Sequence, residues 1–343
     1  MIKPAKLKKG DVIGIISPSW GGPNVFPHIY ENGLKNLKTL GFEIKEFPTA
    51  RGDAKYQYQN PKVRAEDVNA AFANKEVKGI ITTIGGDDSV RILPFLNKET
   101  IANNPKFFMG YSDTTILTTF CRSLGLVTFN GPSIMAGFSQ MEAVGANFKK
   151  HLEDFLLGDF IGYEYKPYDY YFNNYPDWKD KANTGKVSEP VKTTGWRWLQ
   201  GNATIEGELF GGNIEALEFI KGTDYWFDKD FWNGKILFFE TSEDKPTVGQ
   251  IKFMLRNYGT QGIYDKVKAV LFGRARDYSE EEKKELDATL ISVIGFEFGK
   301  PDLPIVSNMD FGHTDPQIIL PLGIRAELNT SNKSFKLLES PFN

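Results

Sequence analysis

Cysteine and long apolar runs are scarce in this chain of 343 residues, and each scarcity excludes a class of protein. The single cysteine, Cys121, excludes an intramolecular disulfide and a cysteine-based zinc cluster, and this usage fits a reducing, cytoplasmic environment. No stretch of 18 apolar residues occurs, so we expect no membrane span. The apolar run near the N-terminus is broken by Gly14, Ser17 and Pro18 and is too short for a secretory leader.

A surplus of either charge is also missing. Lys and Arg number 41 and Asp and Glu number 44, which gives a formal net charge of −3. Without a basic surplus to neutralise phosphates, nucleic acid is not an expected partner. The sequence also lacks a His-x-x-x-His pair, a cysteine pair and an Asp-x-Asp loop with enough ligands, so we expect no metal site and no cofactor.

What the sequence does contain is the pattern of an α/β protein of about two domains. Strand-like runs alternate with helix-like segments, the strands at 11–19, 42–48, 78–86, 105–112 and 127–132 and the helices at 28–41, 61–77, 88–97, 113–124 and 145–157. Such alternation predicts βαβ units around a parallel sheet. Ligands bind beyond the carboxyl ends of such strands, where the Gly- and Ser-rich loops 17–23, 84–89 and 110–115 follow.

Residues 160–203 break this pattern. They are rich in Tyr, Trp, Asn and Pro, have no clear period, and predict a long connection or lid rather than plain disorder. Beyond them we expect strands at 235–241, 268–273, 304–308, 317–323, 324–328 and 334–339, the last ones as antiparallel hairpins, and helices at 213–221, 246–258 and 279–296. The predicted parts are an N-terminal α/β domain (1–160), an aromatic-rich linker or lid (161–203) and a C-terminal domain (204–343).

The most informative motif is Gly-Tyr-Ser-Asp-Thr-Thr at 110–115, which joins an expected buried strand to an expected helix. On such a tight turn, Ser112 would expose its hydroxyl at the end of a sheet, beside the backbone N–H groups that open the helix. Exposure and nearby donors are what a serine nucleophile requires. Ser, Asp and Thr also cap helices well, so an N-cap without any chemistry is the alternative.

A serine nucleophile needs a base, and the chain has three histidines. His28 is expected in an early helical turn and His151 on the solvated face of an amphipathic helix. His313 stands in a turn after a strand, where catalytic side chains are often displayed. Cys121 is expected to pack inside a helix, which makes a Cys–His enzyme a poor alternative.

The third member of a triad is a carboxylate that orients the imidazole. Glu240 ends an apolar strand, where a carboxylate is costly without a partner. Glu243 and Asp244 are expected at the surface or as N-caps, whereas Asp310 and Asp315 flank the histidine and remain rivals for the orienting role.

Two backbone donors for an oxyanion are expected beside the serine. One is Asp113, the next residue, and the other comes from the Gly85-Gly86-Asp87 turn after the neighbouring strand. Glycine lets a backbone approach a ligand closely and expose its N–H groups. The same turn is also common between strands and helices with no such role.

Taken together, these motifs resemble peptidase family S66. The segments that carry the resemblance are IGGDDS (84–89), GYSDTT (110–115), FNGP (129–132), LFGGN (209–213), FFETSED (238–244) and GHT (312–314), in the family's order. The resemblance implies a flavodoxin-like N-terminal domain, a smaller β-rich C-terminal domain, an active site at their interface and a homodimer. It also implies a triad of Ser112 as nucleophile, His313 as general base and Glu240 as orienting acid, with an oxyanion hole near Gly86, Asp87 and Asp113.

Two branches of this family give two substrate hypotheses. LD-carboxypeptidases release D-Ala from murein tetrapeptides, and microcin C immunity proteins cleave the amide between an aminoacyl group and a nucleotide-like moiety. The insert with Trp196 and Trp198 resembles the second branch, so these are the expected substrate-binding residues, stacking on a base. The alternative is that both tryptophan side chains are buried and anchor the loop without contacting a substrate. The Gly-Gly-Asp-Asp loop departs from the Asn-containing loop of the archetypal immunity protein, which leaves the substrate open.

Two other functional classes also remain. A Gly-Gly-Asp-Asp loop after a strand resembles that of NAD-kinase and phosphofructokinase-type phosphotransferases, although such an enzyme would leave Ser112, Glu240 and His313 without a role. A catalytically silent small-molecule binder on the same fold is the other. We favour a serine hydrolase acting on an amide or peptide bond.

Overall fold

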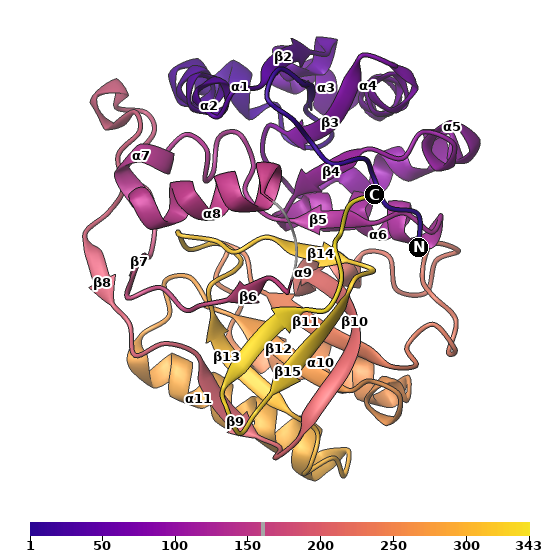
Figure 1. The fold of residues 1–343 in the computed structure, drawn as a ribbon, viewed down its shortest axis with the longest axis vertical. Helices are drawn as coiled ribbons and strands as arrows, with labels where there is room; N and C mark the ends of the chain where they lie inside the picture. The colour runs from indigo at the N-terminus through magenta and orange to yellow at the C-terminus, as the bar shows by residue number, and fades with distance from the viewer. Residues whose placement is uncertain (159–161) are drawn as a thin grey trace.

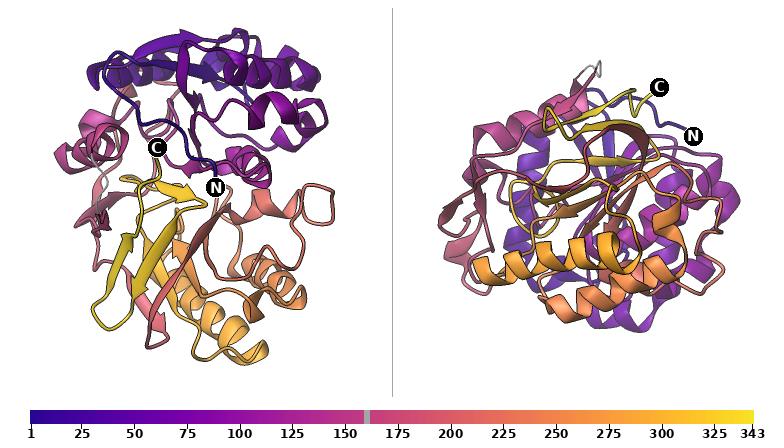
Figure 2. Two further views of the ribbon diagram at one scale, coloured as in Figure 1. Left: turned by 45° about the vertical axis from the view of Figure 1, so that its right-hand side comes forward. Right: turned by 90° about the horizontal axis from the view of Figure 1, so that it is seen from below.

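Two packed parts make up the molecule, the N-terminal part in indigo and magenta above the C-terminal part in orange and yellow (Figure 1). The computed structural model describes residues 1–158 and 162–343. Each part is built on its own sheet. The two chain ends lie side by side where the parts meet (Figure 2), and there the N–H of Asn343 donates to the carbonyl oxygen of Pro4 at 3.0 Å.

The N-terminal sheet has six strands in the order β14-β5-β4-β3-β1-β2. Its parallel strands are β1 (Val12–Ile16), β2 (Glu43–Glu46), β3 (Val77–Thr82), β4 (Phe107–Gly110) and β5 (Thr128–Asn130), and β14 (Leu320–Leu322) is antiparallel to β5. The sequence predicted all five parallel strands, each somewhat longer. Their order, 2-1-3-4-5, is that of flavodoxin, so the expected flavodoxin-like sheet is confirmed.

Short helices connect these strands. They are α1 (Gly22–Val25), α2 (Pro27–Thr39), α3 (Ala54–Gln59), α4 (Pro61–Ala73), α5 (Lys98–Ala102), α6 (Thr115–Ser123), α7 (Met141–Val144) and α8 (Ala146–Leu157), with 3-10 turns η1 (Pro48–Ala50) and η3 (Ser112–Thr114). The α-helix expected at 88–97 is instead a 3-10 helix, η2 (Ser89–Phe95). Pro94 lies inside it and has no N–H for an α-helical hydrogen bond, which explains the difference.

His151 on α8 is buried, which corrects the expectation of a solvated position. Its Nδ1 lies 2.6 Å from the hydroxyl of Tyr163, and its Nε2 accepts the N–H of Ile319 at 3.0 Å. Burial lowers the pKa of His151 to about 4, so the ring is neutral and able to accept that hydrogen bond. The segment leading into β14 covers this side of the helix, a long-range contact that helical periodicity does not reveal.

The C-terminal part has a mixed sheet of eight strands in the order β6-β16-β15-β10-β11-β12-β13-β9. Its parallel centre is β10 (Thr204–Asn213), β11 (Lys235–Glu240), β12 (Ala269–Gly273) and β13 (Ile305–Met309), and its antiparallel strands are β15 (Arg325–Asn329), β16 (Ser334–Leu337), β6 (Glu164–Tyr165) and β9 (Arg197–Gln200). The helices are α9 (Ile214–Glu218), α10 (Val248–Thr260) and α11 (Glu280–Leu290), with the 3-10 turn η5 (Ile263–Asp265) and the π-helix η6 (Ile291–Glu297).

This mixed sheet confirms the expected β-rich α/β character of the C-terminal part. The expected hairpin of β15 and β16 is present, whereas β14 leaves this sheet and joins the N-terminal one. Strand β14, from the C-terminal part of the sequence, thus forms one edge of the N-terminal sheet. The two parts therefore do not divide at a single point in the sequence.

The aromatic-rich segment after residue 161 is ordered around short strands. Besides β6 and β9, it contains β7 (Tyr170–Phe172) and β8 (Pro190–Lys192), which form a sheet of their own, and the 3-10 turn η4 (Lys181–Asn183). Its strands β6 and β9 pair with β16 and β13, so backbone pairing ties this segment to the C-terminal sheet. That it acts as a lid stays a prediction.

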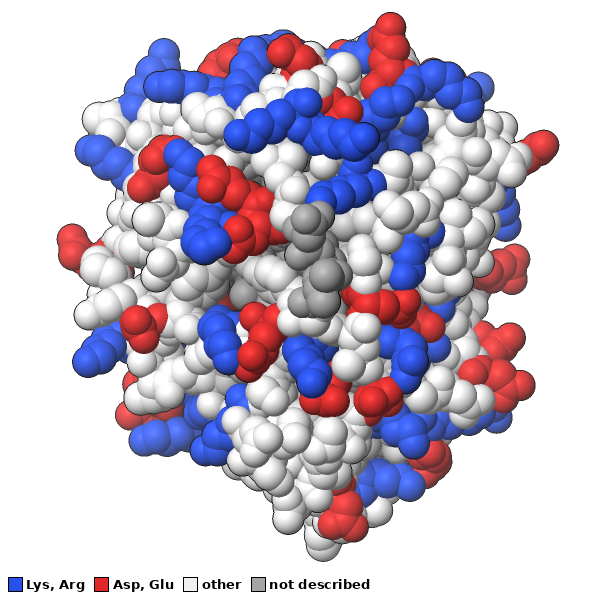
Figure 3. Space-filling model, in the orientation of Figure 1, with Lys and Arg blue, Asp and Glu red and all other residues white. Residues whose placement is uncertain are grey.

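Charged side chains of both signs are interspersed on the face shown in Figure 3. Within residues 1–158 and 162–343, no helix has the length and apolar character needed to cross a membrane.

Candidate active site

Strand β4 carries Ser112 out of the core of the N-terminal sheet. Phe107, Phe108 and Met109 are fully buried, and such burial stabilises a fold by roughly 1.5–3 kcal/mol for each side chain. The chain then turns sharply, and Ser112 takes a left-handed backbone conformation with φ of 59°. Non-glycine residues rarely adopt this conformation, and it is held where the surroundings force it, often at functional sites. The strand-to-helix turn predicted for this serine is therefore present, with a strained backbone.

Gly85 provides the space for that turn. A Cβ atom at this position would lie 2.7 Å from Cβ and 2.8 Å from Oγ of Ser112, closer than atoms can approach. Only glycine therefore lets the two loops pack together with the serine in place.

We expect Gly85→Ala to lower kcat/KM about 100-fold, since a misplacement of about 1 Å at a reacting group costs on that order. The control is Gly249→Ala, because a Cβ there has Thr247 Oγ1 at 3.8 Å as its nearest contact. Steady-state kinetics with a thermal unfolding curve for each variant makes the comparison. Equal activity of the two alanine variants would contradict the packing role of Gly85.

The side chain of Asp113 ties together the three loops that the sequence places at the carboxyl ends of the strands. Its Oδ2 accepts the hydroxyl of Ser19 at 2.6 Å and the N–H of Ser89 at 2.8 Å. Burial raises the pKa of Asp113, and these hydrogen bonds oppose that rise. The carboxyl group thus fixes the loop geometry around Ser112.

The expected oxyanion donors are only partly brought together. Gly86 and Ser112 line the same cavity, and the Asp113 nitrogen lies next to Gly85. Among the backbone hydrogen bonds of loops, turns and caps in the described chain, none is donated by the N–H of Gly86 or of Asp113. Asp87 is exposed and does not line the cavity.

His313 lies in the turn after β13, and its orienting partner is Glu240. Nδ1 of His313 lies 2.6 Å from Oε2 of Glu240, which is fully buried at the end of β11. A Cβ atom at Gly312 would lie 2.8 Å from that same oxygen, so glycine is needed next to the histidine. Asp310 and Asp315 are engaged elsewhere: Asp310 accepts from Arg274 at 2.5 Å and from Trp196 at 2.7 Å, and Asp315 accepts from Tyr175 at 2.8 Å.

Glu243 lies in the same cavity and contacts the other nitrogen of the histidine. Its Oε2 is 3.0 Å from Nε2 of His313, and its side chain is 55% exposed, so the predicted surface position is confirmed while the contact with the histidine was not predicted. Burial alone would lower the pKa of His313, but the carboxylates of Glu240 and Glu243 raise it to about 10. No hydrogen bond joins Ser112 Oγ to His313 in the described chain, because Nε2 faces Glu243.

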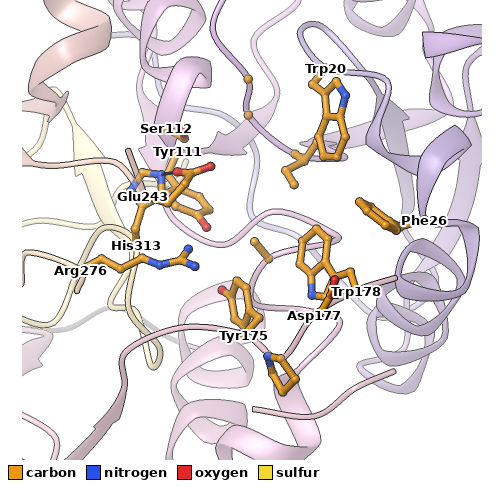
Figure 4. A pocket seen from close by; sticks show the side chains of 15 residues that line it. Trp20, Phe26, Tyr111, Ser112, Tyr175, Asp177, Trp178, Glu243, Arg276 and His313 are labelled. Carbon is orange, nitrogen blue, oxygen red and sulfur yellow. Dashed lines mark ion pairs between the residues drawn. The ribbon is translucent and has the colours of Figure 1, made fainter. Parts of the chain in front are cut away.

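The cavity has a volume of about 330 Å³ and two chemically different sides (Figure 4). Ser112, Glu243, Arg276 and His313 lie on the polar side, and the Arg276 guanidinium points into the cavity. The opposite side is mainly aromatic and carries Trp20, Phe26 and Trp178, with Asp177 next to Trp178. Such a site suits a ligand with a flat apolar part joined to a reactive polar part.

Trp196 and Trp198 do not line this cavity. Trp196 is 8% exposed and donates its Nε1–H to Asp310, and Trp198 sits on β9, paired with β13. Both tryptophans thus attach the aromatic-rich segment to the C-terminal part. The tryptophan of the insert that reaches the cavity is Trp178, whose ring stacks on Tyr175 with centroids 5.7 Å apart.

Trp178 was missed, although the run Tyr175-Pro176-Asp177-Trp178 carries a signal. Proline beside aromatic residues favours a rigid turn that presents rings to a ligand. Trp20 and Phe26 were missed because they lie in the first loop and at the end of α1, far from Ser112 in sequence. No cluster of three or more His, Cys, Asp or Glu side chains able to hold a metal ion occurs in the described parts of the chain.

Comparisons with known proteins bear on the whole chain. Residues 13–131 match the Peptidase S66 model described as the LD-carboxypeptidase N-terminal domain, and residues 206–328 match the LD-carboxypeptidase C-terminal domain. The chain is 28% identical over 342 residues to the Microcin C7 self-immunity protein MccF of Escherichia coli, covering 98% of this chain and 95% of that protein. It is also 28% identical over 336 residues to the "Probable murein peptide carboxypeptidase" of Bacillus subtilis (strain 168), covering 97% and 93%.

A solved structure extends this likeness to the fold. The structure of MccF in complex with glutamyl sulfamoyl guanosine superposes with a TM-score of 0.86 at 25% sequence identity and covers 100% of both chains.

Proposed function

The chain belongs to the peptidase S66 family of LD-carboxypeptidases and is MccF-like, and from this premise we propose that it is a serine hydrolase that cleaves an amide bond. The observation that carries the proposal is the shared cavity of Ser112 and His313, with Glu240 on Nδ1 of the imidazole. Neither a phosphotransferase nor a silent binder requires a strained serine beside a carboxylate-oriented histidine.

The proposed reaction follows the logic of other triads. Ser112 Oγ attacks the amide carbonyl carbon while Nε2 of His313 takes the hydroxyl proton. The N–H groups of Gly86 and Asp113 stabilise the charge that develops on the carbonyl oxygen. The same imidazole then gives its proton to the leaving nitrogen, and water releases the acyl group from the serine. Glu240 holds the ring in place and stabilises the imidazolium that forms.

The aromatic side of the cavity favours an aminoacyl-nucleotide amide as the substrate. Trp178 meets Phe26 edge to face with centroids 5.7 Å apart, and its carbonyl oxygen lies 2.9 Å from Nε2 of His28. Trp20 meets Phe26 edge to face with centroids 6.0 Å apart and is 37% exposed. A preformed aromatic surface of this kind suits stacking with a nucleobase. The solved MccF complex, whose ligand is glutamyl sulfamoyl guanosine, supports this choice.

We expect Trp178→Ala to raise KM for an aminoacyl-sulfamoyl adenosine roughly 5–150-fold, because stacking on one base is worth about 1–3 kcal/mol. Trp178→Phe keeps a ring and should lose far less. Tyr170→Ala removes an exposed aromatic residue of the same insert outside the cavity and should change nothing. An unchanged KM in Trp178→Ala would contradict base stacking at this residue.

Murein tetrapeptide is the second candidate substrate, supported by the Bacillus subtilis relative. The deciding experiment measures kcat/KM of the wild-type protein for the adenosine compound and for D-Ala release from the tetrapeptide, with and without a chelator. Cleavage of the tetrapeptide alone would place the activity with the LD-carboxypeptidases. Turnover that needs ATP and magnesium would contradict the serine hydrolase.

A further inference from the structure

His313 lies between two carboxylates, which favours the protonated ring that cannot accept a further proton. Glu240 lies 2.6 Å from Nδ1 and Glu243 lies 3.0 Å from Nε2. A carboxylate close to each ring nitrogen stabilises the form of the ring that carries a hydrogen on both, so this geometry favours the imidazolium. The two carboxylates raise the pKa of His313 against the effect of burial, which agrees with this reading. A doubly protonated ring has no lone pair for the hydroxyl proton of Ser112.

The two carboxylates differ in their freedom to move. Glu240 is fully buried at a strand end, whereas the Glu243 side chain is 55% exposed on the following loop and faces the cavity. Burial alone would raise the pKa of Glu243, but the hydrogen bond from His313 and the charge of Arg276 hold it at about 2. Glu243 is therefore a charged, half-exposed group that can exchange one cationic partner for another.

We propose that Glu243 recognises a positively charged amino group of the substrate next to the scissile carbonyl, and that this contact releases Nε2 of His313 to Ser112. The inference rests on the proposed function and names its substrate class as amides that carry a free ammonium group. The ammonium replaces the imidazolium as the partner of Glu243, and the Nε2 proton passes to water. One positive charge enters the site as one leaves, so the charge of the pocket is conserved.

This arrangement couples recognition to catalysis. Without an ammonium, Nε2 stays paired with Glu243 and Ser112 lacks a base. When a substrate ammonium group is bound, Glu243 turns toward it and Nε2 of His313 becomes free. Glu243 is a specificity and positioning residue in this scheme, because it acts on the serine only through the histidine.

Labelling of Ser112 by a fluorophosphonate tests the release step, because this probe reacts with an activated serine and carries no amine. The charged and titratable groups that face His313 are Tyr111, Glu240, Glu243, Arg276 and Asp315. Removing the charge of Glu243 lowers the pKa of His313 and leaves more neutral imidazole. We expect Glu243→Gln to be labelled at least about tenfold faster than wild type at pH 7, since each pKa unit changes the neutral fraction about tenfold. The labelling midpoint should move to lower pH.

The substrate arm compares an aminoacyl-sulfamoyl adenosine with its N-acetyl derivative. Wild type should prefer the free amine by at least about tenfold in kcat/KM, and Glu243→Gln should bring the ratio close to one. Asp244→Asn is the matched control, because it removes an exposed carboxylate from the same loop outside the cavity, and it should behave as wild type in both arms.

The outcomes separate this inference from the proposed function. If Ser112 is labelled and the amide is cleaved, but Glu243→Gln matches wild type in labelling rate and amine preference, the role of Glu243 is refuted and the hydrolase stands. If neither protein is labelled and neither cleaves an amide, the proposed function fails and the role of Glu243 fails with it.

Discussion

Ser112→Ala is expected to lower kcat by on the order of 10³–10⁶, with the protein still folded. The variant removes the only atom that forms a bond to the substrate in the proposed reaction. The fold should survive, because Ser112 Oγ makes no hydrogen bond within the described chain, and alanine keeps the Cβ that packs against Gly85. The left-handed backbone at this position is as strained for alanine as for serine, so stability should change little.

The measurement is single-turnover kinetics on the substrate that wild type cleaves, with a thermal unfolding curve for each protein. Ser331→Ala is the control, because Ser331 is an exposed serine in the turn between β15 and β16. Near wild-type turnover in a folded Ser112→Ala protein would falsify the serine mechanism.

The backbone around this serine could be predicted from the sequence because its determinants are local. An apolar run of strand length ends in Gly-Tyr-Ser, and helical spacing begins at once, so β4, the turn and α6 follow from neighbouring residues. The βαβ pattern predicts a parallel sheet, but the order of its strands was expected only from the resemblance to the family. His313 could be selected because only three histidines compete.

Contacts that depend on distant segments could not be predicted in this way. Trp178 reaches the cavity because its loop packs on Phe26 and His28, about 150 positions earlier in the chain. A hydrogen bond to Asp310 holds Trp196 away from the cavity. His151 is buried because the chain just before β14 packs against it, where the N–H of Ile319 donates to its ring. Glu243 lies 3.0 Å from His313, a residue 70 positions later in the chain. Periodicity identifies which face of an element is apolar, but not which remote group comes to lie against it.

Glu240→Gln is the second change with a large expected effect, a loss of about 10⁴ in kcat by comparison with the equivalent change in other triads. A neutral amide can present its N–H₂ to Nδ1, which favours the wrong tautomer, and it no longer stabilises the imidazolium. The site is fully buried and Gly312 packs against the carboxylate, so the geometry of the ring should be preserved while its chemistry is lost. Glu206→Gln makes the same chemical change at an exposed ion pair on β10 and is the control.

Combining this change with the loss of the serine tests whether the residues act as one unit. Effects within a triad are grossly non-additive, because a histidine without its nucleophile has nothing to deprotonate. The double variant Ser112→Ala/Glu240→Gln should therefore be little slower than Ser112→Ala alone. The double variant Ser112→Ala/His313→Ala should likewise be little slower than Ser112→Ala alone. If the two losses instead multiply in full, Glu240 and His313 contribute independently of the serine. The carboxylate on Nδ1 would then stabilise the fold rather than support the reaction.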